Sequence, residues 1–375
     1  MIKAVKVRLR PTKEQEQKLW QSAGVSRFAY NWALIKQKEN HDAGGKFLND
    51  QTLRKEFTKI KQSEEYAWLY EVSNNVTKQA IKDANVAFMN FFKKKSKYPR
   101  FKSKKRSKPA FYNDSVKLKF KQDKFLIEKV GWVRVSEAER ILPGKFYNPR
   151  ISYDGKYWYI SVGRDVEPEQ EKLTPESIGL TFSVDNLFYA SNDMHSPNFM
   201  NTPTITKLSK KIARLKRTTK RRYTMNQVSD PNPEAKSIHS HNMRKAQNQL
   251  ILAQRRLNNI KLNHIHQATT ALVKTKPNRI VMQSPQTKSL DKDMVLSKSI
   301  SEQGIYNFKR ILEYKCKSAG VQFIASMEPL STHTDTCYLC GHSERQPGNV
   351  FHCPSCKESV SKDYQAASNL AISNW

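Results

Sequence analysis

The chain has 375 residues, and 66 Lys and Arg against 34 Asp and Glu give it a formal charge of +32. This length allows two or three domains with buried cores, and so large a positive excess indicates a polyanionic partner rather than a merely soluble cationic surface. The sequence has no run of about 20 apolar residues and no apolar signal core, which excludes a membrane span and a secretory leader. We therefore expect an intracellular protein that binds nucleic acid.

The N-terminal part predicts one strand and three helices. Residues 2–9 alternate apolar and polar side chains, as a half-buried strand does. Thr12 can cap the long helix that follows, with Gln15 three positions later. Two more helices are expected at about 50–61 and 73–92.

Residues 93–109 contain ten basic residues in seventeen, interleaved with Tyr98 and Phe101. Their prolines and serines indicate a loop or an extended arm. Lys and Arg can neutralise phosphates and the rings could stack on bases, so we favour nucleic-acid contact; a solvated flexible linker is the alternative. The candidate contacts are Arg100, Lys102, Lys104, Lys105 and Arg106.

Residues 115–165 predict β structure, because they alternate with period two and contain the hairpin signal Asp154-Gly155. We expect a barrel or small sheet here that includes the first strand. Residues 13–108 would then be an insertion into it.

The C-terminal half predicts an α/β domain around a mixed sheet. A strand pair follows residue 176, and further strands are expected at 278–284 and 321–327. Between them lie two long helices, about 204–223 and 243–275, which we expect to form an antiparallel pair. Nine of the sixteen residues 207–222 are Lys or Arg. These charges could only solubilise the helix, but we favour nucleic-acid contact through Lys210, Arg214, Arg217 and Arg221.

Four cysteines form two CxxC pairs, Cys337 with Cys340 and Cys353 with Cys356, separated by twelve residues. Two such turns can offer four thiolates to one tetrahedral ion, so the sequence predicts a zinc site. Four sulfur ligands leave no open position, and the ion should be structural. Cys316 lies outside this set and is expected to be a free thiol.

Several segments occur in an order that resembles one known family. They are AIKDANVAFMNFFKKKSKYPRFKSKK, LEYKCKSAG, CYLC with CPSC, and KDYQAASNLA. Together they resemble the transposon-encoded TnpB (OrfB) family, relatives of the compact type V CRISPR effectors, over essentially the whole chain. The resemblance implies an α+β multidomain protein, monomeric in a ribonucleoprotein, that binds a guide RNA and double-stranded target DNA beside a short flanking motif.

The resemblance also implies the domain order. Residues 1–12 and 109–172 would form a wedge β-barrel, and residues 13–108 its helical recognition insert. Residues 173–330 and 359–375 would form a RuvC (RNase-H-like) domain, interrupted by a zinc ribbon at 331–358. On the recognition helix, Lys78 and Gln79 would read base edges, with Lys82 as a further contact; an exposed polar pair explains Lys78 and Gln79 equally well.

RuvC-type cleavage needs three acidic side chains that hold two divalent metals. At the family's three acidic positions this chain has Thr181, Gln283 and Asp363. One carboxylate cannot hold two dications, so we expect no functional magnesium site and no catalytic residues. Rescue by Asp185, Asp291, Asp293 or Glu302 is the alternative that we consider least favourable.

The substitutions imply a nuclease-dead, RNA-guided transcriptional repressor in the bacterial cytoplasm, associated with the nucleoid when bound to its target. The alternatives are an RNA-guided endonuclease with an atypical RuvC site and a decayed transposon remnant. The intact zinc ligands and basic segments favour the repressor over the remnant.

Overall fold

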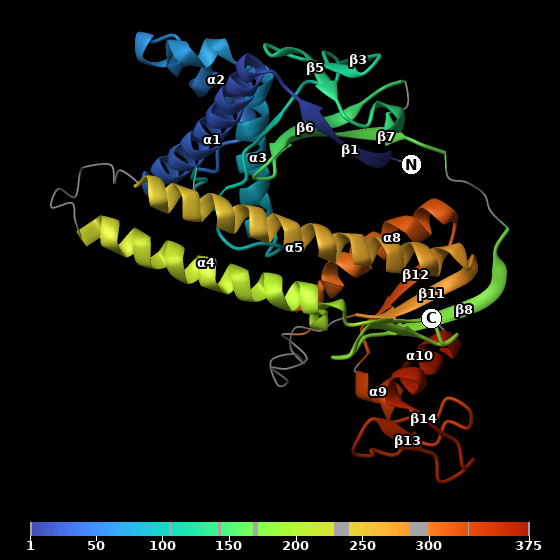
Figure 1. Cartoon of the computed structure of the whole chain (residues 1–375). Helices are drawn as coiled ribbons and strands as arrows, with labels where there is room; N and C mark the ends of the chain where they lie inside the picture. The colour runs from blue at the N-terminus through green and yellow to red at the C-terminus, as the bar shows by residue number, and fades with distance from the viewer. Residues whose placement is uncertain are drawn as a thin grey trace. The chain divides into compact units, whose positions relative to one another are not determined.

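The computed structural model divides the chain into two compact units, Met1–Val166 and Glu167–Trp375 (Figure 1). Each unit has its own sheet and its own hydrophobic core. The structure describes residues 2–104, 107–141, 144–167, 172–228, 240–284, 299, 301–328 and 330–373.

An antiparallel sheet in the order β2-β6-β7-β1-β5-β4-β3 forms the framework of the first unit. Its central strand β1 pairs with β7 from Ile2 opposite Asp165 to Arg8 opposite Tyr159, and its last two residues pair with β5. The chain leaves the sheet after β1 and returns at β2, so the helices between them are an insertion. The elements of the sheet are β1 (Ile2–Arg10), β2 (Ala110–Tyr112), β3 (Lys119–Lys121), β4 (Lys124–Ile127), β5 (Gly131–Val135), β6 (Tyr147–Tyr153) and β7 (Trp158–Asp165), with the 3-10 helix η2 (Ala138–Arg140).

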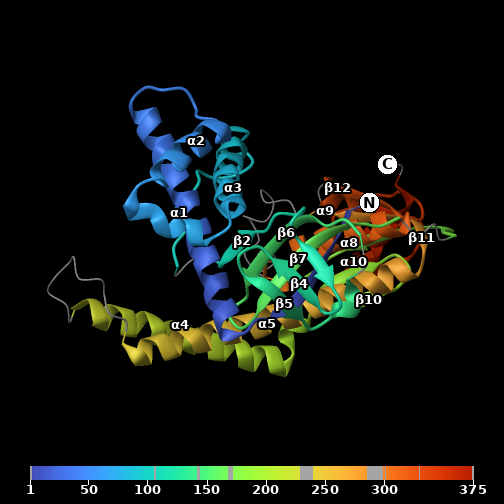
Figure 2. The same cartoon turned by 90° about the horizontal axis from the view of Figure 1, so that it is seen from above.

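The inserted helices begin at the predicted cap. The Thr12 hydroxyl accepts a hydrogen bond from the Gln15 N–H, and the Gln15 side chain accepts one from the Thr12 N–H, which confirms the predicted capping box. Figures 1 and 2 show α1 and α3 side by side. The Arg150 guanidinium on β6 binds both carboxylate oxygens of Asp83 on α3, at 2.6 and 2.9 Å, and so ties the insert to the sheet. The elements are α1 (Lys13–Asp42), α2 (Asp50–Ile60), η1 (Glu64–Glu71) and α3 (Asn74–Phe92).

A mixed sheet in the order β10-β9-β8-β11-β12 forms the framework of the second unit. Strand β11 is parallel to both β8 and β12, whereas β9 and β10 complete an antiparallel meander with β8. The carboxyl ends of three parallel strands therefore meet at one edge. The strands are β8 (Thr174–Thr181), β9 (Asn186–Ala190), β10 (His195–Pro197), β11 (Pro277–Gln283) and β12 (Gln322–Ser326).

Helices cover both faces of this sheet, with α5 and α8 on one face and α10 on the other (Figure 1). Residues 301–303 are helical, the chain turns at Gly304, whose φ of +84° is left-handed, and α8 begins after it. The elements are η3 (Phe199–Asn201), α4 (Pro203–Val228), α5 (His241–Lys274), α8 (Ile305–Ala319), α9 (Leu330–Thr334), β13 (Val350–His352), β14 (Ser359–Ser361) and α10 (Lys362–Ile372). None of the helices in the described residues is long and apolar enough to cross a membrane.

Lys315 joins α8 to α5. Its ammonium donates to the His266 carbonyl and to the hydroxyls of Thr269 and Thr270, each at 2.7 Å. Burial lowers the pKa of Lys315 to about 8, because a charged amine is costly away from water. Between pH 8 and the ordinary pKa of lysine, the unfolded chain therefore still carries this proton, whereas the folded chain has largely released it.

We expect the stability of the wild type relative to Lys315→Met to rise as the pH rises through 8, since the folded state no longer carries the buried charge. Denaturant unfolding of both proteins between pH 7 and 10 measures this difference. Lys317→Met, at an exposed position on the same helix, is the control and should show no such trend. A stability difference that is independent of pH would contradict the prediction.

Candidate metal centre and nucleic-acid interface

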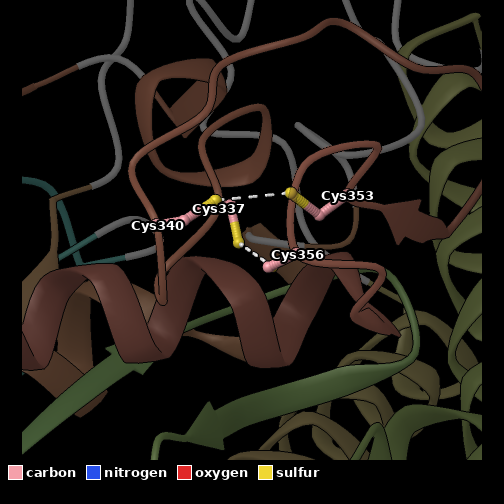
Figure 3. A group of neighbouring side chains, drawn as sticks. All are labelled: Cys337, Cys340, Cys353 and Cys356. Carbon is pink, nitrogen blue, oxygen red and sulfur yellow. Dashed lines mark hydrogen bonds between the residues drawn. The ribbon is translucent and has the colours of Figure 1, made fainter.

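Four cysteines converge near the end of the chain (Figure 3). The sulfur atoms lie within 4.8 Å of one another, and those of Cys337 and Cys356, like those of Cys340 and Cys353, are 3.5 Å apart. Tetrahedral zinc with bonds of about 2.3 Å places its sulfur ligands about 3.8 Å apart, so this spacing fits a structural zinc ion.

Each CxxC pair lies on a tight backbone turn. The Gly341 N–H donates to the Cys337 carbonyl at 2.9 Å, and the Lys357 N–H donates to the Cys353 carbonyl at 3.0 Å. Gly341 and Lys357 both have left-handed φ angles, of 75° and 65°, which turn the chain back after each pair. The two turns are built alike, so the four thiols face one point.

Helix α10 is attached directly to this cysteine module. The Asn369 amide donates to the His333 carbonyl at 2.8 Å and to the Thr336 carbonyl at 2.6 Å. The Gln365 amide also donates to Thr336, which immediately precedes Cys337. Loss of the metal should therefore loosen α10 as well.

The three positions of the expected nuclease centre lie on the α10 face of the second sheet. Gly179 of β8 lies so close to α10 that a Cβ there would clash with the Ala367 carbonyl oxygen. Thr181, two residues further on, shares this face, and Gln283 ends the neighbouring strand at the same level, since Leu180 pairs with Met282. Both Thr181 and Gln283 are buried.

Asp363 completes this group from the first turn of α10. Its carboxylate accepts a hydrogen bond from the Asn186 side chain of β9 at 3.3 Å. Asp363 also contributes to the raised pKa of Tyr189, after burial and Asp193, and Tyr189 pairs with Thr181 across the β8–β9 hairpin. The sheet register and α10 thus bring together three residues far apart in the sequence.

The chemistry of this group is largely neutral. The Gln283 amide donates to the Glu328 backbone carbonyl at 2.7 Å, and its own oxygen is buried without a hydrogen-bond partner among the described residues. Within the same part of the chain, the four cysteines are the one group of three or more His, Cys, Asp or Glu side chains placed to hold a metal. Asp363 therefore has no pair of acids converging on it there.

The acids considered as substitutes take other positions. Asp185 is exposed on the β8–β9 turn, and its carbonyl accepts from the Asn198 N–H at 2.7 Å. Glu302 is exposed, and its carbonyl accepts from Lys261. Asp291 and Asp293 lie outside the described residues.

The sequence reading missed two residues of this region, Asn186 and Glu328. Glu328 follows β12, and its carboxylate lies 3.2 Å from His333 Nε2. The available signal was its position just past an apolar strand, because the carboxyl ends of parallel strands gather at one edge of a sheet.

The basic candidates of the first unit differ in exposure. Lys78 and Lys82 are exposed one turn apart on α3, whereas the Gln79 amide donates to Asp83 at 2.8 Å. Lys102 lies 3.7 Å above the Tyr30 ring, and burial lowers its pKa. Arg100 and Lys104 are exposed, and Lys105 and Arg106 lie outside the described residues.

Helix α4 presents its charges to solvent. Lys210, Arg214, Arg217 and Arg221 are all exposed, and the described parts of α4 and α5 contain no Asp or Glu. Ile205, Leu208, Ile212 and Leu215 are buried instead. The helix therefore separates an apolar face from a basic one.

Comparison with known proteins identifies the class to which these units belong. Residues 1–46 match the OrfB/IS605 helix-turn-helix domain, and residues 306–370 match the Cas12f1-like TNB domain, which contains the four cysteines. The chain thus combines an OrfB-type beginning with a Cas12f1-like end.

Two curated relatives match almost the whole chain, and a third matches a shorter part of it. An Escherichia coli K12 protein named as a candidate RNA-guided DNA endonuclease, InsQ, is 27% identical over 98% of this chain and 91% of its own length. A Streptomyces pristinaespiralis protein with a similar name is 24% identical over 98% of this chain and 88% of its own. The Salmonella dublin virulence protein VsdF is 34% identical over 28% of this chain and 95% of its own.

The chain carries an OrfB/IS605 helix-turn-helix domain and a Cas12f1-like TNB domain and is homologous to proteins of the InsQ (TnpB) type, in agreement with the resemblance that the sequence motifs indicated. A solved structure titled as the mini-RNA-guided endonuclease CRISPR-Cas_phi3 has a similar fold, with a TM-score of 0.52 and 11% identity over 99% of this chain and 92% of that one.

Proposed function

We propose that this protein is an RNA-guided, sequence-specific DNA-binding protein without nuclease activity. A guide RNA would supply sequence recognition by base pairing, and the protein would hold the backbone and read a short flanking motif. An R-loop over a promoter would then block transcription without any chemistry. In this proposal the first unit is the wedge domain with its recognition insert, and the second is a RuvC-like domain with a zinc ribbon.

The observation that carries the proposal is the neutral character of the buried pair Thr181 and Gln283 beside Asp363. Two divalent ions repel each other and need several anionic oxygens to lie side by side. One carboxylate bonded to Asn186 provides too little negative charge for them. By contrast, α4 still exposes the basic residues that would contact phosphates, and all four cysteines of the candidate zinc site are present.

The second candidate is an RNA-guided endonuclease with an atypical site, because two relatives are named as candidate endonucleases. It requires acids other than the three family positions to hold the metals. Asp291 and Asp293, which lie outside the described residues, are the candidates for this role.

To test the proposal, the protein is purified with its co-purifying RNA, and that RNA is sequenced to define the matched target. We expect the complex to retard matched DNA in a gel and to leave it uncut in magnesium or manganese. The Asp363→Asn variant should bind equally well. Scission by the wild type that disappears in Asp363→Asn would establish the endonuclease instead.

A further inference from the structure

An aromatic cluster lies where α3 ends. Phe88, 5% exposed, is at its centre, and its ring centroid lies 5.9 Å from that of Phe47, 6.2 Å from Phe92 and 5.5 Å from Tyr98. Phe91 completes it, 5.7 Å from Phe92 and 5.3 Å from Tyr98. We call these five residues the α3 aromatic platform.

The outer rings of the platform are open to solvent. Phe47 is 40% exposed, Phe92 54% and Tyr98 53%. Neighbouring large aromatic side chains exposed in this way are unfavourable in water, and such a patch marks an interaction site. The packing on Phe88 holds the rings in place, so a ligand would find them already ordered.

Positive charge surrounds the platform. Seven of the twelve residues 93–104 are Lys or Arg, and none is Asp or Glu. The N–H groups of Lys94 and Lys95 donate to the carbonyls of Phe91 and Asn90, at 2.9 and 2.8 Å, which fixes the start of this segment against the end of α3. The exposed cations are Lys93, Lys94, Lys95, Lys97, Arg100 and Lys104.

Another exposed aromatic surface of the same insert, on η1, carries three glutamates and has one lysine beside it, Lys61, whose ammonium lies 4.6 Å from the Tyr70 ring centroid. Trp68 and Tyr70 on η1 are 42% and 55% exposed, but they lie among Glu64, Glu65 and Glu71. Exposed rings alone therefore do not set the α3 platform apart. What distinguishes the platform is the combination of exposed rings with cations, which is complementary to a polyanion that carries planar, stackable groups.

We infer that the α3 aromatic platform binds unpaired nucleotides of a polynucleotide. Their bases would stack on the exposed rings of Phe92 and Tyr98 while the neighbouring cations neutralise the phosphates. A duplex hides its base faces except at its ends, so the platform selects single strands. The inference rests on the proposed function, in which the guide RNA and the displaced DNA strand both supply unpaired nucleotides.

The experiment compares the full-length wild type with the variant Phe92→Ala, Tyr98→Ala. Binding is measured to a single-stranded RNA, the single-stranded DNA of the same sequence, and the corresponding blunt duplex. We expect the variant to lose about tenfold or more in affinity for at least one single strand, because stacking on each base contributes substantially. Duplex affinity and the salt dependence of binding should stay unchanged, because no phosphate contact is removed.

Two controls complete the design. Tyr70→Ala removes an equally exposed tyrosine from the acidic surface and should leave every affinity unchanged. Tyr98→Trp with Phe92 retained should keep single-strand binding, since it preserves a stacking ring. The strand type that loses more affinity identifies whether RNA or DNA occupies the platform.

Equal losses on single strands and duplex, or no loss at all, would overturn the inference. So would binding of the wild type, but not the variant, to vesicles of phosphatidylserine and phosphatidylcholine with single-strand binding intact in both. If the wild type binds no polynucleotide of any kind, the proposed function itself fails, which is a different result from an unaffected variant.

Discussion

The variant Thr181→Asp, Gln283→Glu is expected to become less stable than the wild type and to be stabilised by manganese. The Gln283 amide donates to the Glu328 carbonyl, and a glutamate there would place a buried carboxylate oxygen against that carbonyl. An unmatched buried polar group costs about 1–3 kcal/mol, and a charged one costs more. With Asp363 nearby, three acids would share one face of the sheet, and a divalent cation would offset their repulsion.

Thermal unfolding with and without manganese measures this effect. The uncharged variant Thr181→Asn, Gln283→Met is the matched control, because it loses the same hydrogen bond without adding charge. We expect a metal-dependent rise in melting temperature for the acidic variant alone. A rise of similar size in the wild type would mean that its centre already binds metal, against the nuclease-dead proposal.

DNA cleavage by the acidic variant is a further outcome of the same experiment. Restored cutting would support the proposal that the neutral side chains of Thr181 and Gln283 prevent cleavage. Metal binding without cutting would mean that charge at these positions suffices to hold the ion but that further residues around the centre have changed.

Cys353→Ser is expected to lose bound zinc and to unfold the cysteine module. A hydroxyl is a poor replacement for a thiolate, and structural zinc sites contribute about 10–16 kcal/mol of apparent binding free energy to folding. Metal analysis of the purified protein should fall from one zinc per chain to well below it. Hydrogen exchange should also become faster in α10, since Gln365 and Asn369 bond to the carbonyls of His333 and Thr336.

Cys316→Ser is the control for this variant. Cys316 is buried on α8 among apolar side chains, outside the group of four, and burial raises its thiol pKa to about 12. A serine there should lower stability by leaving a hydroxyl in an apolar core, but zinc content should stay at one per chain. Stoichiometric zinc in Cys353→Ser would refute the four-cysteine site.

Local signals in the sequence were sufficient for many elements. The capping box at Thr12 and Gln15, and the apolar faces of α4, depend on neighbours within a few residues, so their pattern can be read directly. The break at Gly304 was not predicted, because a glycine within a helical pattern does not reveal whether its φ is positive.

The structure gives two of the expected nucleic-acid contacts partners within the protein. Gln79 and Lys102 were expected as nucleic-acid contacts, yet the structure pairs Gln79 with Asp83 and places Lys102 over Tyr30. Asp83 lies one turn from Gln79 on the same helix, whereas Tyr30 lies on another helix, far from Lys102 in the sequence. The expected contacts of Lys78, Lys82 and the α4 cations remain predictions.

The sequence by itself indicated the family resemblance, the four cysteines that could bind zinc and the neutral residues Thr181 and Gln283, because each depends on residue identity and short spacing. Only the tertiary structure decided what surrounds those positions. The register of β8 and β11 and the close approach of α10 to Gly179 place Thr181, Gln283 and Asp363 on one face. It also decided that Phe47 and Tyr98 share a platform with the end of α3, since long-range contacts depend on the packing of the whole unit and not on any local pattern.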